Sequence, residues 1–260
     1  MKKLTRAAIL IGGAVLATQS AFAFQQNDLY LGFQNSAGGG SADYIINLGA
    51  ASGIVGQSPV VDLSGSFSSS LFNNAALQGS SSQIMAGVVG GENSATGAGT
   101  ADIFLAQLRT SNFGNAAVAG STLTQKLTQG QDNTAEADLS PLVSLTAGTG
   151  FLDSSKSWET SVEPSLAGSF YQGTGVNPDS LFSSSTVLYE DLYETSNASS
   201  GRGAAANPFT YLGYFSLDLT GGSPSLTFTQ AVPEPTVLGL LGGAGFLLLS
   251  SRRRFSGKNW

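Results

Sequence analysis

The stretch that decides the fold is Asn27-Asp28-Leu29-Tyr30-Leu31-Gly32-Phe33, near the start of the chain. Its hydrophobic side chains alternate, and Leu29, Leu31 and Phe33 fall on one face, which is the two-residue period of a β-strand. A glycine-rich turn at residues 38–41 follows, and a second apolar run occupies residues 44–48. The two runs predict an antiparallel hairpin at the beginning of the folded part.

Similar strand signals recur along the chain and are separated by clusters of Gly, Ser and Asn. The nearly unbroken apolar run at residues 84–89 predicts a central strand, and residues 103–108 complete a second hairpin with it. Further strands are predicted at residues 158–162, 184–193, 209–219 and 226–230, and the last two form a final hairpin. Along residues 209–219, the alternation places on one face the side chains of Phe209, Tyr211, Phe215, Leu217 and Leu219.

Two segments have helical spacing instead. Apolar residues at 67–75, followed by Gly79, predict one short helix, and Leu123 and Leu127 suggest another at residues 121–129. The chain shows no alternation of strands with long helices, and no internal repeat. The sequence therefore predicts an all-β fold, an antiparallel β-sandwich or jelly roll with one or two short helices.

The first 23 residues have the three parts of a secretory signal peptide. A positive segment contains Lys2, Lys3 and Arg6, and an apolar segment follows at residues 7–17. Ala21-Phe22-Ala23 then provides the small residues, Ala21 and Ala23, of a cleavage site. We expect cleavage after Ala23, which leaves the exported domain as residues 24–231.

Residues 232–260 form a second sorting element at the other end of the chain. Pro233-Glu234-Pro235 leads into an apolar run at residues 236–251, which stops at Arg252, Arg253 and Arg254. As a helix the run would measure roughly 24 Å, which is short of the roughly 30 Å hydrocarbon core of a bilayer. The arginines place the basic tail, residues 252–260, on the cytoplasmic side and the domain outside the cytoplasm.

This order of motif, short apolar helix and arginine cluster resembles the PEP-CTERM sorting signal of Gram-negative bacteria. Pro233-Glu234-Pro235 matches the tripeptide of that signal, and Arg252, Arg253 and Arg254 match its basic end. The resemblance implies that the tail is a transient anchor in the inner membrane, recognised by the membrane protease-transpeptidase exosortase and cut near the tripeptide. An ordinary permanent tail anchor is the alternative, and it predicts the same topology.

The exported part of the chain is strongly acidic. Residues 24–234 contain only four basic residues, Arg109, Lys126, Lys156 and Arg202, against all 17 acidic residues of the chain, so that their formal charge is about −13. Because phosphate binding depends on clustered Lys and Arg, this composition excludes nucleic acid as a partner.

The chain has no cysteine and no histidine. Thiolate chemistry, disulfides, histidine-dependent triads and the commonest metal ligands are therefore excluded. Neither a Ser-x-x-Lys dyad nor a nucleotide-binding glycine motif is present. The acidic residues Asp132, Glu136 and Asp138 lack the order of a calcium-binding EF-hand. We predict no catalytic residues, no metal site and no cofactor.

Two groups of side chains are candidates for a function of the exported domain. Trp158, Tyr189 and Tyr193, together with Tyr211 and Tyr214, could form an aromatic surface for carbohydrate contact. The second group consists of carboxylates that could pair as acid and base of a glycosidase, either Glu159 with Glu163 or members of the set Glu190, Asp191 and Glu194.

Three functional hypotheses follow. The leading one is a non-enzymatic cell-surface or extracellular-matrix protein that is exported, briefly anchored, processed by exosortase and associated with exopolysaccharide. The alternative is a carbohydrate-binding or adhesive module, which requires Trp158 and several tyrosines to be exposed on one face. A carboxylate-dependent glycosidase is the third, and it requires two acids in one cleft.

Overall fold

The computed structural model of the chain describes most of the region between the two sorting elements. The described residues are 27–35, 40–57, 59–66, 84–93, 101–124, 126–128, 131, 134–135, 138–139, 142, 148–162, 174, 180–182, 187–196, 207–218 and 224–232.

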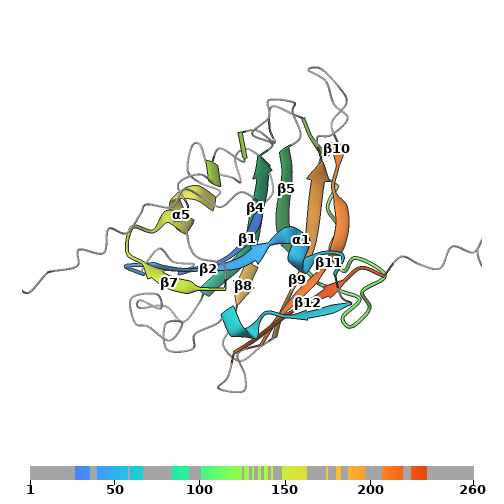
Figure 1. The fold of residues 1–260 in the computed structure, drawn as a ribbon, viewed down its shortest axis with the longest axis horizontal. Helices are drawn as coiled ribbons and strands as arrows, with labels where there is room; N and C mark the ends of the chain where they lie inside the picture. The colour runs from blue at the N-terminus through green and yellow to red at the C-terminus, as the bar shows by residue number, and fades with distance from the viewer. Residues whose placement is uncertain are drawn as a thin grey trace, which may run out of the picture.

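The described residues form an antiparallel sheet of ten strands and a separate pair of short strands (Figure 1). The order across the large sheet is β3-β12-β11-β9-β5-β4-β1-β2-β7, and β8 pairs with β4. Its members are β1 (Asp28–Asn35), β2 (Asp43–Ala50), β3 (Val60–Asp62), β4 (Ile84–Asn93), β5 (Ala101–Leu108), β7 (Gly150–Asp153), β8 (Ser180–Phe182), β9 (Val187–Ser196), β11 (Thr210–Asp218) and β12 (Ser225–Gln230). β6 (Lys126–Leu127) and β10 (Asn207–Pro208) form the separate pair.

The first strand is an interior strand of this sheet, between β4 and β2, and is buried along its whole length. Its residues contribute alternately to two hydrophobic clusters, as the two-residue period requires. Leu29, Leu31 and Phe33 belong to one cluster, which also contains Phe215 and Phe228 and which we call the inner cluster. Tyr30 belongs to the other, which also contains Trp158 and Val162 and which we call the outer cluster. The stretch that opens the fold is thus a strand buried on both faces.

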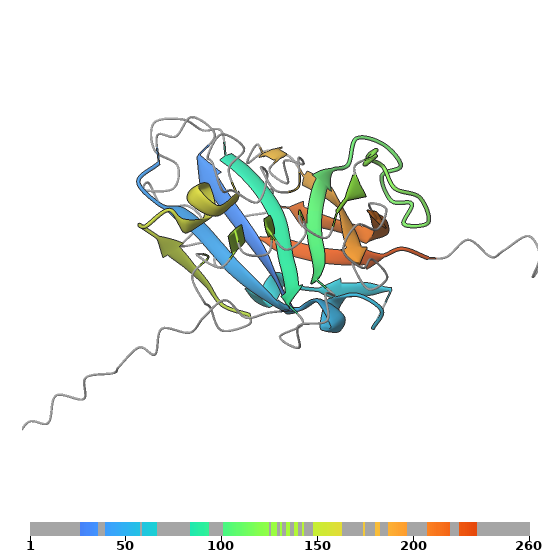
Figure 2. The ribbon, with the colours of Figure 1, turned by 90° about the horizontal axis from the view of Figure 1, so that it is seen from above.

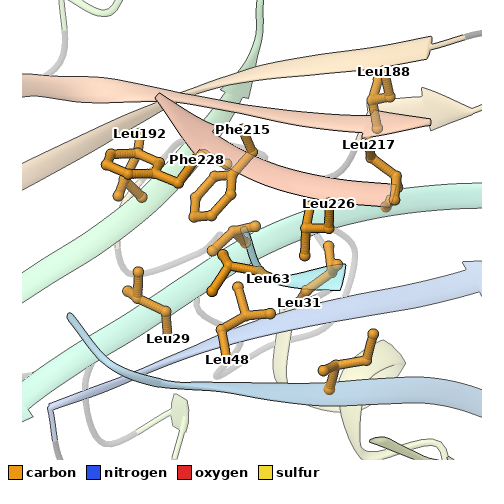
Figure 3. Close-up of a cluster of buried hydrophobic side chains, with 14 of the residues drawn as sticks. Leu29, Leu31, Leu48, Leu63, Leu188, Leu192, Phe215, Leu217, Leu226 and Phe228 are labelled. Atoms are coloured by element: carbon orange, nitrogen blue, oxygen red, sulfur yellow. The ribbon is translucent and has the colours of Figure 1, made fainter. Parts of the chain in front are cut away.

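The sheet is strongly curled (Figures 1 and 2), and the inner cluster contains side chains from strands of both of its halves. In Figure 3, Leu188, Phe215 and Leu217 of one half point toward Leu31 and Leu48 of the other. Two parts of one sheet therefore face each other across a common core, as the two layers of a sandwich do. The predicted all-β, antiparallel, sandwich-like fold is confirmed.

The predicted hairpins are also confirmed. β1 pairs with β2, β4 pairs with β5, and β11 pairs with β12, each antiparallel. The sequence did not indicate the pairing of β5 with β9, which joins the two halves of the sheet. Two short helices have described bounds, α1 (Ala51–Ile54) and α5 (Ser157–Val162).

The strand predicted at residues 158–162 is wrong, because these residues belong to α5. Trp158 and Val162 are four residues apart and both lie buried in the outer cluster, which is the spacing of one helix face. The indole of Trp158 lies over Gly32 of β1, where an added Cβ would come within 1.9 Å of its ring. The glycine therefore creates the room for the tryptophan on the outer face.

The face predicted for residues 209–219 is also partly wrong. The pairing of β11 with β9 shifts between Tyr211 and Gly213, so that Tyr211 pairs with Tyr193 while Phe215 pairs with Glu190. Such a bulge reverses the alternation, and Tyr211 lies on the other face from Phe215. Gly213 has φ +147°, and its Cβ would lie 2.3 Å from the carbonyl oxygen of Thr229, so that only glycine fits the bulge.

The helix suggested at residues 121–129 is wrong, because Lys126 and Leu127 form β6. The other predicted helix, at residues 67–75, lies outside the described residues, which stop at the short turn η1 (Ser64–Ser66) and resume at residue 84. The predicted signal peptide, with Ala21 and Ala23, and the predicted sorting signal from Pro233 to the C-terminus lie outside them as well. Within the part that the structure describes, no helix has the length and apolar character needed to cross a membrane.

Candidate functional site

Arg109 is the organising residue of the most elaborate polar cluster among the described residues. It follows the last residue of β5, and its backbone N–H donates to the carbonyl of Tyr189 on β9 at 2.8 Å. The side chain turns to the outer face of the sheet, where it is 2% exposed and forms an ion pair with Asp191 of β9. The neighbouring strands β5 and β9 thus place a buried cation beside a buried anion.

Two tyrosines of β11 complete the surroundings of the guanidinium. Nη1 of Arg109 donates to the hydroxyl of Tyr211 at 3.0 Å, and Cζ lies 4.4 Å from the ring centroid of Tyr214. Burial acts to lower the pKa of Arg109, but the hydrogen bonds to Asp191 and Tyr211 outweigh it and raise the pKa above its usual range. The guanidinium therefore stays charged, which its contacts with Asp191 and Tyr214 require.

The second terminal nitrogen of Arg109 holds the loop that follows β5. Nη2 donates to the carbonyl oxygens of Asn112 at 2.5 Å, Asn115 at 2.6 Å and Val118 at 3.0 Å. A planar guanidinium offers five N–H donors, so that one side chain can satisfy several carbonyls at once. Residues 110–120 are in this way wrapped around the arginine, and we refer to them as the Arg109 loop.

Asp191 closes the end of the Arg109 loop. Its Oδ2 accepts hydrogen bonds from the backbone N–H of Gly120 at 2.7 Å and from the N–H and hydroxyl of Ser121 at 2.6 and 2.7 Å. At the neck of the loop, the N–H groups of Thr110 and Ser111 both donate to the carbonyl of Gly120. The two ends are therefore adjacent, as in an Ω-loop. In Figure 2 this segment projects beyond the strands, away from α5.

The Arg109 loop presents Phe113 to solvent. The side chain is 57% exposed, and its ring lies 5.2 Å from that of Tyr189 at an interplanar angle of 57°. The residues on either side, Asn112 and Gly114, have φ values of +54° and +79°. Left-handed backbone at a non-glycine residue is uncommon and occurs often at binding sites. The sharp turn that these residues produce directs the aromatic ring outward.

The predicted carbohydrate contact through Trp158 is wrong, because that side chain is fully buried in the outer cluster. The tyrosines predicted with it do gather on one face, but around Arg109 and largely below the surface. Tyr193 and Tyr214 are only 5% and 7% exposed, whereas Tyr189 is half-buried. Burial raises the pKa of Tyr193, whose hydroxyl lies 2.9 Å from that of Ser121.

The carboxylates predicted on β9 do not converge on one cleft. Glu190 lies on the face of Leu188 and Leu192, which belong to the inner cluster, and Asp191 lies on the opposite face with Arg109. Glu190 and Glu194 share a face but are separated by about 13 Å along the strand, more than the roughly 5 to 9 Å that glycoside hydrolysis uses. Glu159 pairs with Lys156 at 2.7 Å, and Glu163 lies outside the described residues.

A second group of carboxylates surrounds the start of α5. Asp43 of β2 accepts the N–H of Glu159 at 2.7 Å, and Asp153 of β7 accepts that of Ser157 at 2.7 Å. Burial raises the pKa of Asp43 to about 7, and the charges of Glu159 and Asp153 add to this effect. Burial also acts on the pKa of Asp153, but its hydrogen bonds from Ser155 and Ser157 lower it overall. The two carboxylates attach the helix to the sheet edge.

A cavity of about 230 Å³ opens beside α1. Its walls include Phe104 of β5 and Glu194 of β9, and the others are Asn27, Ala51, Ser52 and Val55. This volume is below the roughly 300 to 1,000 Å³ of typical ligand pockets. Among the residues that the structure describes, no group of three or more carboxylates could hold a metal ion.

The central role of Arg109 was not predicted from the sequence. The available signal was a lone arginine directly after an apolar strand, in a domain with very few basic residues. Its partner Asp191, 82 positions later, gave a similar signal, because it is a charged residue inside a predicted strand. Charged residues in predicted strands of a chain with few bases are candidates for buried pairs.

Comparison of the chain with protein-family models, with curated proteins and with solved structures finds no match.

Proposed function

We propose that this chain is a non-enzymatic cell-surface or extracellular-matrix protein, exported by the signal peptide at residues 1–23. In this proposal residues 236–251 anchor it briefly in the inner membrane, exosortase processes it near Pro233-Glu234-Pro235, and the released domain associates with exopolysaccharide. The observation that carries the proposal is the order of tripeptide, apolar run and Arg252, Arg253 and Arg254 at the end of the chain.

The positions of the first and last strands along the chain, β1 and β12, are compatible with cleavage at both ends of the domain. β1 begins at Asp28, after the expected cleavage at Ala23, and β12 ends at Gln230, before Pro233. Ala231 still donates its N–H to the carbonyl of Leu212, and the next side chain, Val232, is 54% exposed. The chain thus leaves the sheet immediately before the tripeptide, and removing either end takes away none of the described strands.

The experiment that tests this proposal is fractionation of producing cells into inner membrane, outer envelope and medium. We expect the wild-type protein in the outer envelope or medium, and we expect Glu234→Ala to accumulate in the inner membrane. Replacing Arg252, Arg253 and Arg254 together by serine should also prevent release. Lys126→Ser, at an exposed position of the domain, is the matched control and should behave as wild type. Identical distributions for all four proteins would contradict the proposal.

A further inference from the structure

Phe113 is the most exposed large hydrophobic side chain among the described residues and the one aromatic residue in that group. Because burying a phenylalanine side chain is favourable, an exposed ring represents binding free energy that folding does not use. Single exposed hydrophobic side chains are common on protein surfaces, but this ring lies 5.2 Å from that of Tyr189, so that the two together offer an aromatic surface.

The exposure of Phe113 is enforced by the surrounding loop. The carbonyl of Asn112, the residue in left-handed conformation before it, accepts a hydrogen bond from buried Arg109, and the side-chain amide of Asn112 donates to the carbonyl of Ala119 at 2.9 Å. Phe113 therefore cannot relax into the core without breaking these contacts. A ring that is already held in place loses little conformational entropy when a ligand binds.

The Arg109 loop around Phe113 carries no charged side chain, and it combines polar residues with the exposed apolar Val118. No Asp, Glu, Lys or Arg occurs in residues 110–124, whereas the chain as a whole has a net charge of −6. Asn112 and Asn115 are exposed; Oδ1 of Asn112 and the side-chain NH₂ of Asn115 form no hydrogen bond within the described residues. The surface thus offers a ring, an amide acceptor and an amide donor, in an overall field that repels anions.

These features fit a neutral sugar. One face of a pyranose ring presents C–H groups that pack on an aromatic ring, and its hydroxyls both donate and accept hydrogen bonds. A protein partner fits less well, because a standard interface buries about 800 Å² on each side, and the loop exposes only two large apolar side chains, Phe113 and Val118.

We propose that the Arg109 loop is a contact site for a neutral polysaccharide, with Phe113 and Tyr189 as the aromatic platform and Asn112 and Asn115 as hydrogen-bonding groups. This inference rests on the association with exopolysaccharide in the proposed function and assigns that association to one loop. It is independent of the sorting signal.

The test is co-sedimentation of the protein, recovered as it exists from the envelope or medium of producing cells, with insoluble neutral polysaccharides, namely cellulose, a β-1,3-glucan and a mannan. Calcium alginate serves as the anionic comparison. We expect the wild-type protein to bind at least one neutral polymer, and Phe113→Ala to bind it about three- to tenfold more weakly, the range that aromatic contacts give. The thermal midpoint of Phe113→Ala should be unchanged, because the side chain is exposed.

Two further variants separate stacking from simple hydrophobic docking. Phe113→Trp should retain binding, and Phe113→Leu should lose it as Phe113→Ala does, because leucine keeps the apolar character without the ring. Val60→Ala is the matched control, since Val60 is 53% exposed on the edge strand β3. It should bind as wild type does.

Three results would overturn the inference. If the Phe113→Ala variant binds a neutral polymer as strongly as wild type does, the Arg109 loop is not the contact site, while the proposed association with polysaccharide stands. Binding to alginate alone, or to none of the polymers, would refute both the loop and the association with neutral polysaccharide, and the sorting proposal would keep its own test. Self-association that Phe113→Ala abolishes, seen by analytical ultracentrifugation without polysaccharide binding, would assign the ring to a second copy of the chain.

Discussion

Arg109 satisfies acceptors from three parts of the chain, which are the carboxylate of Asp191, the hydroxyl of Tyr211 and three carbonyls of the loop. A residue with a single charged nitrogen, such as lysine, could not make all of these contacts, because they diverge from two terminal nitrogens. Removal of the arginine would leave Asp191 as a buried anion without its countercharge. The largest effects of single substitutions in the domain are therefore expected at this pair.

We predict that Arg109→Met lowers the free energy of unfolding by about 3 to 5 kcal/mol, the cost of leaving one member of a buried ion pair. Urea denaturation measures this change. Lys126→Met is the matched control, because Lys126 is exposed, and its change should stay below about 0.5 kcal/mol. A loss below about 1 kcal/mol for Arg109→Met would show that the pair contributes little.

Gly32 is required for the packing of the outer cluster, because the indole of Trp158 occupies the space that a side chain at position 32 would fill. We predict that Gly32→Ala costs about 3 kcal/mol or more through overpacking. In a Trp158→Leu background the same substitution should cost much less, because the space is then vacant. Gly53→Ala, whose added Cβ would contact nothing within 4 Å, is the control and should be neutral or slightly stabilising. Equal costs of Gly32→Ala in both backgrounds would contradict this packing.

Among the elements, α5 is attached to the sheet edge through titratable groups. The pKa of Asp43 in the folded protein is raised to about 7 from an ordinary value of 3.8, so that the folded state binds a proton that the unfolded state has lost. Between these two values the unfolded state binds fewer protons, and stability should fall as the pH rises. The groups that face Asp43 are Asp153 of β7 and, at α5, Lys156 and Glu159.

We predict that wild type loses stability relative to Asp43→Asn between about pH 4 and about pH 7, by up to roughly 4 kcal/mol at the top of this range. Comparison with the variant removes the contribution of the other carboxylates. Asp153 has a lowered pKa, so its contribution is lost only as the pH falls further. Urea denaturation at several pH values measures the difference, and a difference independent of pH would contradict the assignment to Asp43.

In the Arg109 loop, the two ends approach each other so closely that Gly120 has no room for a side chain. A Cβ on Gly120 would lie 2.1 Å from the carbonyl oxygen of Ser111 and 2.4 Å from Cγ of Arg109. We predict that Gly120→Ala opens the neck of the loop and increases protease cleavage within residues 110–120, with the sheet intact by circular dichroism. Gly65→Ala, which has no neighbour within 4 Å, should leave the cleavage rate unchanged. Cleavage of Gly120→Ala at the rate of wild type would show that the loop tolerates a wider neck.

At the scale of the whole molecule, the sequence predicted local pairing well and long-range pairing poorly. The hairpins of β1 with β2, β4 with β5 and β11 with β12 follow from alternation and nearby turns. The contact of β5 with β9 joins segments about 90 residues apart, and no periodicity encodes it. The same holds for the pair of Arg109 and Asp191, which that contact creates.

The errors have local physical causes. Trp158, Thr160 and Val162 fit a two-residue period, but Trp158, Ser161 and Val162 fit a helix face equally well, and the room above Gly32 favours the helix. The bulge at Gly213 moves Tyr211 to the face of Arg109, and a single-sequence pattern gives no sign of it beyond the glycine itself. The site was missed for the same reason, since its parts come together only in the curled sheet.

We propose that the tail is a processed sorting signal, and intact-mass analysis of the protein from the envelope and medium of producing cells tests this proposal. We predict loss of residues 1–23 and loss or replacement of the chain beyond the region of Pro233, with the second change abolished by Glu234→Ala. A C-terminus that still ends at Trp260 in the wild-type protein, bound to the membrane, would contradict the account and indicate a permanent anchor.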